Sequence, residues 1–117
     1  MITKGIRGAI TVEENTVEAI QAGTLKLLDE IVEKNNIDRT MVSHVIFTLT
    51  KDLTAAFPAK FARLDRGWTD VAMLCFNEAD IDGSIEKCIR ILVVLNCEEY
   101  FVPQYVYLKG ASKLRSN

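Results

Sequence analysis

The sequence predicts an α+β fold in which helices pack on a β-sheet. Five segments of strand length carry alternating or continuous apolar residues, and two segments between them show the signals of helices. The chain has 117 residues, which suffice for one hydrophobic core but not for two. We therefore treat residues 1–117 as a single domain.

The first predicted strand covers residues 5–12. Its alternation places Arg7 on the same face as the small residues Gly5 and Ala9. Small neighbours leave space around the guanidinium, which suggests that Arg7 receives a ligand.

A long helix is expected to follow the first strand. Asn15 with Glu18 three residues later is typical of a helix start, and the helix should continue to about Lys34. Apolar side chains recur at spacings of three and four, so one stripe of this helix should pack on the sheet. That stripe comprises Ile20, Thr24, Leu27, Leu28 and Ile31.

The middle of the chain is predicted to be a strand over residues 43–50 and a short helix from Pro58 to Arg66. The strand contains His44, the only histidine, to which we assign no chemistry because no acidic partner is implied nearby. Lys60 and Arg63 share one face of the short helix. Taken alone, this pair favours a solvated basic edge.

Three further strands are predicted, over residues 71–75, 87–96 and 104–109. Arg90 lies in the second of these, among apolar neighbours on both faces, and a buried guanidinium is costly unless it meets an anion. A structural ion pair with Glu78 and a bound anionic ligand are both compatible with this position. The polar residues 110–117 are expected to form a mobile tail.

Composition excludes several classes of function. The net charge is −2, so there is no global positive field to attract nucleic acid or anionic lipid. No apolar stretch is long enough to span a membrane and no signal peptide is recognised, so we expect a cytoplasmic protein. The cysteines Cys75, Cys88 and Cys97 have no metal-site spacing and are expected to be reduced thiols.

Catalytic and cofactor motifs are also missing. No phosphate-binding glycine loop and no serine-hydrolase motif occurs, and the acidic residues near Asp80 fit no calcium loop. We therefore expect neither metal nor cofactor. What remains is a set of cations suited to a small carboxylate ligand, because arginine binds carboxylates in two-point fashion and keeps its charge when desolvated. The set comprises Arg7, Lys60, Arg63, Arg90 and Arg115.

Several segments together resemble the trimeric, pseudo-α/β-barrel class of chorismate mutases, and the resemblance covers nearly the whole chain. They are Gly5-Ile6-Arg7-Gly8-Ala9-Ile10-Thr11-Val12-Glu13, Ala56-Phe57-Pro58-Ala59-Lys60 with Arg63, Cys75 with Glu78, Lys87-Cys88-Ile89-Arg90, and Val106-Tyr107-Leu108. The resemblance implies a mixed β-sheet with helices on one face. It also implies a homotrimer with an active site at each subunit interface, acting on chorismate and releasing prephenate.

The resemblance also implies roles for individual residues. Arg90 corresponds to the cation that faces the breaking ether bond of chorismate, and Glu78 to the group that hydrogen-bonds the ring hydroxyl. Arg7 and Tyr107 resemble carboxylate binders, and Phe57 an apolar wall. The remaining substrate-binding residues are Leu74 and Cys75 beside the substrate, where Leu74 replaces a hydroxyl found in some members, and Lys60, Arg63 and Arg115 at the rim.

Two alternatives share this fold. One is a non-catalytic trimer that binds a small carboxylate, which fits less well because a binder has no need of a cation at the breaking bond. The other is an enamine or imine deaminase, for which no water-activating constellation is found. Fold alone does not decide between them.

Overall fold

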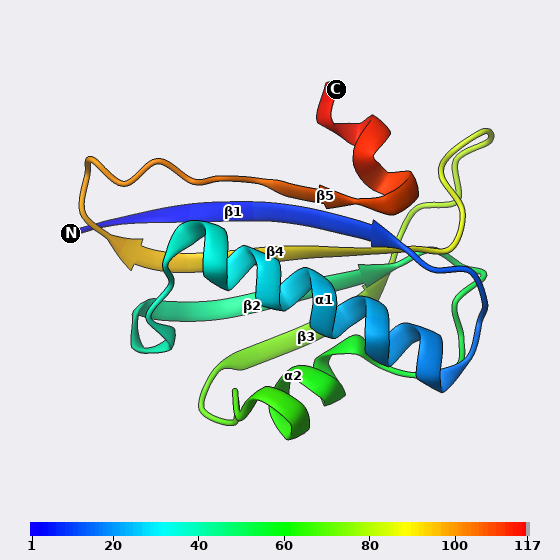
Figure 1. Cartoon of the computed structure of the whole chain (residues 1–117), viewed down its shortest axis with the longest axis horizontal. Helices are drawn as coiled ribbons and strands as arrows, with labels where there is room; N and C mark the ends of the chain where they lie inside the picture. The colour runs from blue at the N-terminus through cyan, green and yellow to red at the C-terminus, as the bar shows by residue number, and fades with distance from the viewer. Residues whose placement is uncertain (117) are drawn as a thin grey trace.

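The computed structural model describes residues 1–116, with side chains described as far as Leu114 (Figure 1). Its elements, in chain order, are β1 (Ile2–Thr11), α1 (Val17–Asn35), η1 (Arg39–Met41), β2 (Val42–Leu49), α2 (Pro58–Arg66), β3 (Ala72–Asn77), β4 (Cys88–Cys97), β5 (Val106–Leu108) and η2 (Lys109–Ser116). The predicted α+β class is confirmed.

The five strands form one mixed sheet in the order β3-β2-β4-β1-β5. The central strand β4 pairs antiparallel with β1 and β2, whereas β3 and β5 pair parallel with their neighbours at the two edges. The parallel pair of β2 and β3 is connected through α2, as a parallel connection requires a crossover. The fifth strand is shorter than predicted, because only residues 106–108 reach the edge of β1.

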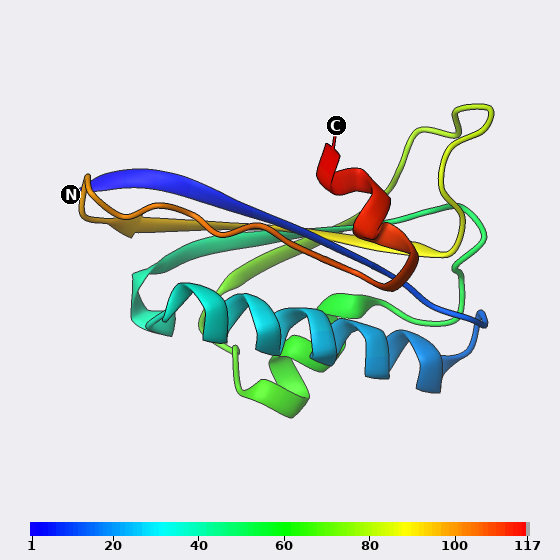
Figure 2. The same cartoon turned by 45° about the horizontal axis from the view of Figure 1, so that its top comes forward.

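Helices α1 and α2 lie together on one face of the sheet, as Figure 2 shows. The main core fills the space between these helices and the sheet. Its α1 stripe is at most 1% exposed and comprises Ile20, Leu27, Leu28 and Ile31. It packs on strand residues that include Ile6, Phe47 and Val93. Gly8 permits this close approach, since a Cβ there would lie 2.8 Å from Ile31 Cδ1 and 3.0 Å from the carbonyl oxygen of Val106.

The helix start differs from the prediction by one residue. Thr16, not Asn15, is the N-cap of α1, and its side chain accepts a hydrogen bond from the amide of Ala19. Asn15 instead accepts hydrogen bonds from the amides of Thr54 and Ala55, at 2.9 and 3.0 Å. The sequence pattern missed this because the partner segment lies 39 residues further along the chain. By contrast, α2 begins at Pro58 and ends at Arg66, as predicted, and Gly67 caps it in the left-handed conformation.

The C-terminal segment lies on the other face of the sheet (Figure 2). Residues 110–117 were expected to form a mobile polar tail, whereas residues 109–116 form the 3-10 helix η2. A second small cluster joins its Ala111 to Ala9, Cys88 and Tyr107. The mobility expected for residues 110–117 stays a prediction.

None of the helices described here has the length and apolar character needed to cross a bilayer.

The role of Asn15 can be tested by replacing it with alanine. Because each intramolecular hydrogen bond contributes about 1 kcal/mol, we expect Asn15→Ala to lower the free energy of unfolding by about 1–2 kcal/mol. Urea unfolding at constant protein concentration measures this. The matched control is Glu18→Gln, which should cost about 0.5 kcal/mol or less because it weakens only a favourable interaction with the helix N-terminus. Equal losses for both variants would contradict the assigned role.

Candidate functional site

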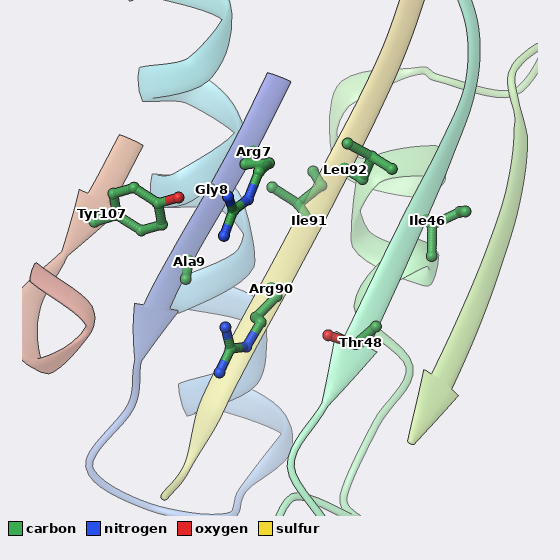
Figure 3. A pocket seen from close by; sticks show the side chains of 9 residues that line it. All are labelled: Arg7, Gly8, Ala9, Ile46, Thr48, Arg90, Ile91, Leu92 and Tyr107. Atoms are coloured by element: carbon green, nitrogen blue, oxygen red, sulfur yellow. The ribbon is translucent and has the colours of Figure 1, made fainter. Parts of the chain in front are cut away.

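The open face of the sheet, opposite α1 and α2, carries a cavity of about 300 Å³. Figure 3 shows that its lining comes from β1, β2, β4 and β5. The lining residues are Arg7, Gly8, Ala9, Ile46, Thr48, Arg90, Ile91, Leu92 and Tyr107.

The strand register brings the polar groups of this cavity together. Ala9 of β1 lies opposite Tyr107 of β5 on one side and Arg90 of β4 on the other. Arg90 in turn lies opposite Thr48 of β2. One row of side chains therefore crosses four strands. Ala9 is the small member of this row, and it leaves the space between Tyr107 and Arg90 that Figure 3 shows.

Arg90 is held by Glu78, the first residue after β3. Its Nε lies 3.1 Å from Glu78 Oε1 and 3.0 Å from Oε2. The two side chains are 35% and 17% exposed, so the pair is only partly screened by water. Both interpretations left open by the sequence remain compatible with this geometry. The ion pair exists, and among the side chains described here it engages the guanidinium through Nε alone, which leaves Nη1 and Nη2 for a ligand.

Arg7 lies two residues from Ala9 along β1, on the same open face. It is exposed, and its guanidinium carbon is 5.7 Å from the centre of the Tyr105 ring. This distance is within the range of a cation–π contact, which restrains the side chain while leaving its hydrogen-bond donors available. Tyr107 is 9% exposed and borders the same cavity. The cavity thus combines two arginines and a phenol with apolar walls, an arrangement that fits a small, mostly apolar anion.

The other predicted site residues do not line this cavity. Phe57, Lys60 and Arg63 belong to the start and outer surface of α2, and Phe57 is 70% exposed. Leu74 lies on the open face beside Ile46 but is 62% exposed. Cys75 points to the opposite side and packs against the main core. Within one chain, the predicted site residues therefore form two sets. One lies at the cavity or is paired with a residue that lines it, and comprises Arg7, Glu78, Arg90 and Tyr107. The other lies at α2 and β3.

The side chain of Arg115 lies outside the described residues, so its predicted place at the rim stays a prediction.

Two of the cysteines, Cys75 and Cys88, are poor nucleophiles. Burial raises the pKa of the Cys75 thiol, despite the opposing effects of the Ala59 amide and the Arg63 charge. Burial also raises the pKa of Cys88 to about 11. No cluster of three metal-ligating side chains occurs in the described part of the chain.

Three lining residues, Thr48, Ile46 and Leu92, were not predicted from the sequence. For Thr48 a signal was available: it is a polar residue inside an apolar strand, on the face that the core does not use. The sequence of β2 does not indicate which strands lie next to it in the sheet. Without the strand order, Thr48 could not be placed beside Arg90.

Comparisons with known proteins agree with one another. The chain matches the family described as chorismate mutase type I over residues 3–117. It is 40% identical to chorismate mutase AroH from Bacillus subtilis over 119 aligned positions, covering 98% of this chain and 91% of that protein. It is 44% identical to chorismate mutase AroH from Thermus thermophilus, covering 97% and 94% of the two chains.

A solved structure described as chorismate mutase from Clostridium thermocellum is also similar. It superposes with a TM-score of 0.89 at 48% sequence identity, and the match covers 94% of this chain and 98% of that one. Sequence and backbone thus give the same assignment over nearly the full length. The chain belongs to the chorismate mutase type I family.

Proposed function

We propose that the cavity on the open face, completed by a neighbouring subunit, converts chorismate to prephenate by holding a reactive conformer and stabilising the charge that develops. Membership of the family makes the chain a chorismate mutase, an isomerase of the shikimate pathway and aromatic amino acid biosynthesis. The observation that carries the proposed mechanism is the Nη edge of Arg90, which no described side chain engages, in a mostly apolar cavity.

The chemistry explains why so few reactive groups are needed. The rearrangement is a concerted shift of bonds within one molecule, so it requires neither a nucleophile nor proton transfer. A million-fold acceleration corresponds to about 8 kcal/mol of transition-state stabilisation. A well-placed charge in a desolvated site supplies roughly 3–4 kcal/mol of this, and restriction to the chair-like conformer supplies much of the rest.

In this proposal Arg90 meets the ether oxygen, where negative charge grows as the carbon–oxygen bond breaks. Glu78 accepts a hydrogen bond from the ring hydroxyl while it orients Arg90. Arg7 and Tyr107 bind carboxylates of the dianion. These roles are supported by the arrangement of the four groups. Tyr107 and Arg90 lie in the row across the sheet, and Arg7 lines the same cavity. Glu78 is ion-paired with Arg90.

The second set of residues supports a site shared between subunits. The set lies at α2 and on the edge strand β3, and none of its members lines the cavity of its own chain. Its members are Phe57, Lys60, Arg63, Leu74 and Cys75. Edge residues are well placed to reach a neighbour's open face. We therefore propose a homotrimer in which the exposed members of this set close the adjoining subunit's cavity, with Phe57 as an apolar wall and the cations Lys60 and Arg63 at the rim. In this arrangement Cys75 packs behind them against its own core. A cytoplasmic location belongs to the same proposal.

Replacing Arg90 tests the electrostatic role. We expect Arg90→Ala to lose at least 10²–10³-fold, roughly the effect of removing one transition-state charge stabiliser, and mainly in kcat. Arg90→Lys should also be poor, because an ammonium cannot span the ether oxygen and a carboxylate together. Lys60→Ala should chiefly raise KM. Chorismate consumption in chelator-containing buffer gives the kinetics.

The competing interpretation is that Arg90 only holds the fold through Glu78. Removing it would then leave the partly buried Glu78 carboxylate without its counter-charge and lower the melting temperature. Melting curves, light scattering and kinetics on the same Arg90→Ala sample separate the two. A well-folded assembly with near-normal turnover would rule out the electrostatic role.

Subunit mixing tests the shared site. Light scattering should give the mass of three chains, and Arg90→Ala chains should complement chains carrying both Lys60→Ala and Arg63→Ala after joint refolding. If each site combines residues of two subunits, random mixing restores about a quarter of the sites in a cyclic trimer. The control is the two variants mixed without refolding. Recovery no greater than that of the control would place all these residues in one chain's site.

The rate should vary little between about pH 6 and pH 9, because no proton is transferred and arginine stays charged over this range. Burial keeps Cys75 and Cys88 neutral, since it raises the pKa of each thiol. Steady-state kinetics in overlapping buffers measure the profile. A bell-shaped curve with both limbs inside this window would indicate acid–base catalysis instead.

A further inference from the structure

Thr48 donates a second hydrogen bond to the Glu78 carboxylate that Arg90 also contacts. Its hydroxyl donates to Glu78 Oε2 at 2.5 Å, and the same carboxylate receives Arg90 Nε at 3.0–3.1 Å. Thr48 and Arg90 are register partners on β2 and β4. Two neighbouring strands therefore hold one carboxylate between them.

This contact matters because Glu78 is the last residue before an exposed loop that has a backbone hydrogen bond to the sheet. Its amide donates to the carbonyl oxygen of Leu49 at 2.9 Å, while residues 79–84 that follow are exposed. The glutamate side chain has several freely rotating bonds, and an ion pair to Nε alone leaves the carboxylate free to pivot. A second donor removes that freedom.

Threonine suits this task better than a more flexible residue. Its branched Cβ restricts the first side-chain torsion in a strand, so the direction of the hydroxyl is set before any ligand binds. Hydrogen bonds to a carboxylate are stronger than those between neutral groups, and members of one network reinforce each other.

We propose that Thr48 is a positioning residue of the active site. Its hydroxyl orients the Glu78 carboxylate, and through Glu78 it orients Arg90 so that Nη1 and Nη2 face the substrate. This inference rests on the proposed function. It assigns no contact between Thr48 and the substrate.

The test compares Thr48→Val, which keeps the shape but removes the hydroxyl, with Thr48→Ser, which keeps the hydroxyl. We expect Thr48→Val to lower kcat about 10-fold, as loss of a hydrogen bond to a charged group implies, with a smaller change in KM. Thr48→Ser should retain most of the activity. The matched control is Thr3→Val: Thr3 also lies in a strand, and its hydroxyl donates to Asn96 at 2.8 Å, away from the cavity. Thr3→Val should keep wild-type kcat and KM.

A second readout needs no substrate. In isotope-labelled protein, the NMR signal of the Arg90 Nε–H group, assigned by its loss in Arg90→Lys, reports the hydrogen bond to Glu78. We expect Thr48→Val to shift or broaden this signal, and Thr48→Ser and Thr3→Val to leave it in place. Melting temperatures of all variants show whether they fold alike.

Three results would overturn the inference. One is wild-type kcat in Thr48→Val. Another is a loss of kcat in Thr48→Val with an unchanged Arg90 signal, which would mean that Thr48 acts on the substrate directly. The third is an equal loss in Thr48→Ser. Failure of the proposed function gives a different result, because wild type and Thr3→Val would then also leave chorismate unconsumed.

Discussion

The side-chain alternation of the central strand β4 is the constraint on which the rest of this structure depends. Ile89, Ile91, Val93 and Leu95 are at most 4% exposed and form the floor of the core beneath the helices. The residues between them, beginning with Arg90, necessarily face the other side. Burying the apolar set thus forces a charged side chain onto the open face. A shift of one residue would bury Arg90 and expose the core.

Arg90 can serve as a ligand-binding group on the open face because the neighbouring strands leave room for its side chain and supply polar partners. Ala9 leaves room on the β1 side, and Thr48 faces it from β2. Glu78 supplies the counter-charge without occupying the whole guanidinium. A partly buried charge with one edge satisfied and the other not used by any described side chain is preorganised for an incoming anion, since little reorganisation is needed when the ligand arrives.

The fold also explains why one chain looks incomplete as an enzyme. The two helices protect one face of the sheet, while the opposite face presents the cavity together with apolar side chains such as Leu74 and Phe76, which are 62% and 49% exposed. Apolar exposure of this kind is typical of surfaces that meet another subunit. The proposed trimer would bury it and complete the site in the same step.

The sequence by itself determined the kinds and approximate limits of the main elements, because their signals are local. Apolar spacing identified α1, and Pro58 with Gly67 marked both ends of α2. Alternation along β4 singled out Arg90 as a charge that needs an anion. The family resemblance supplied the activity, which the comparisons support.

Only the tertiary structure decided which residues meet. The row from Tyr107 to Thr48, the partner of Asn15 and the division of the site residues into two sets all depend on strand order and register. Those are properties of contacts between segments far apart in the chain, and no local pattern encodes them.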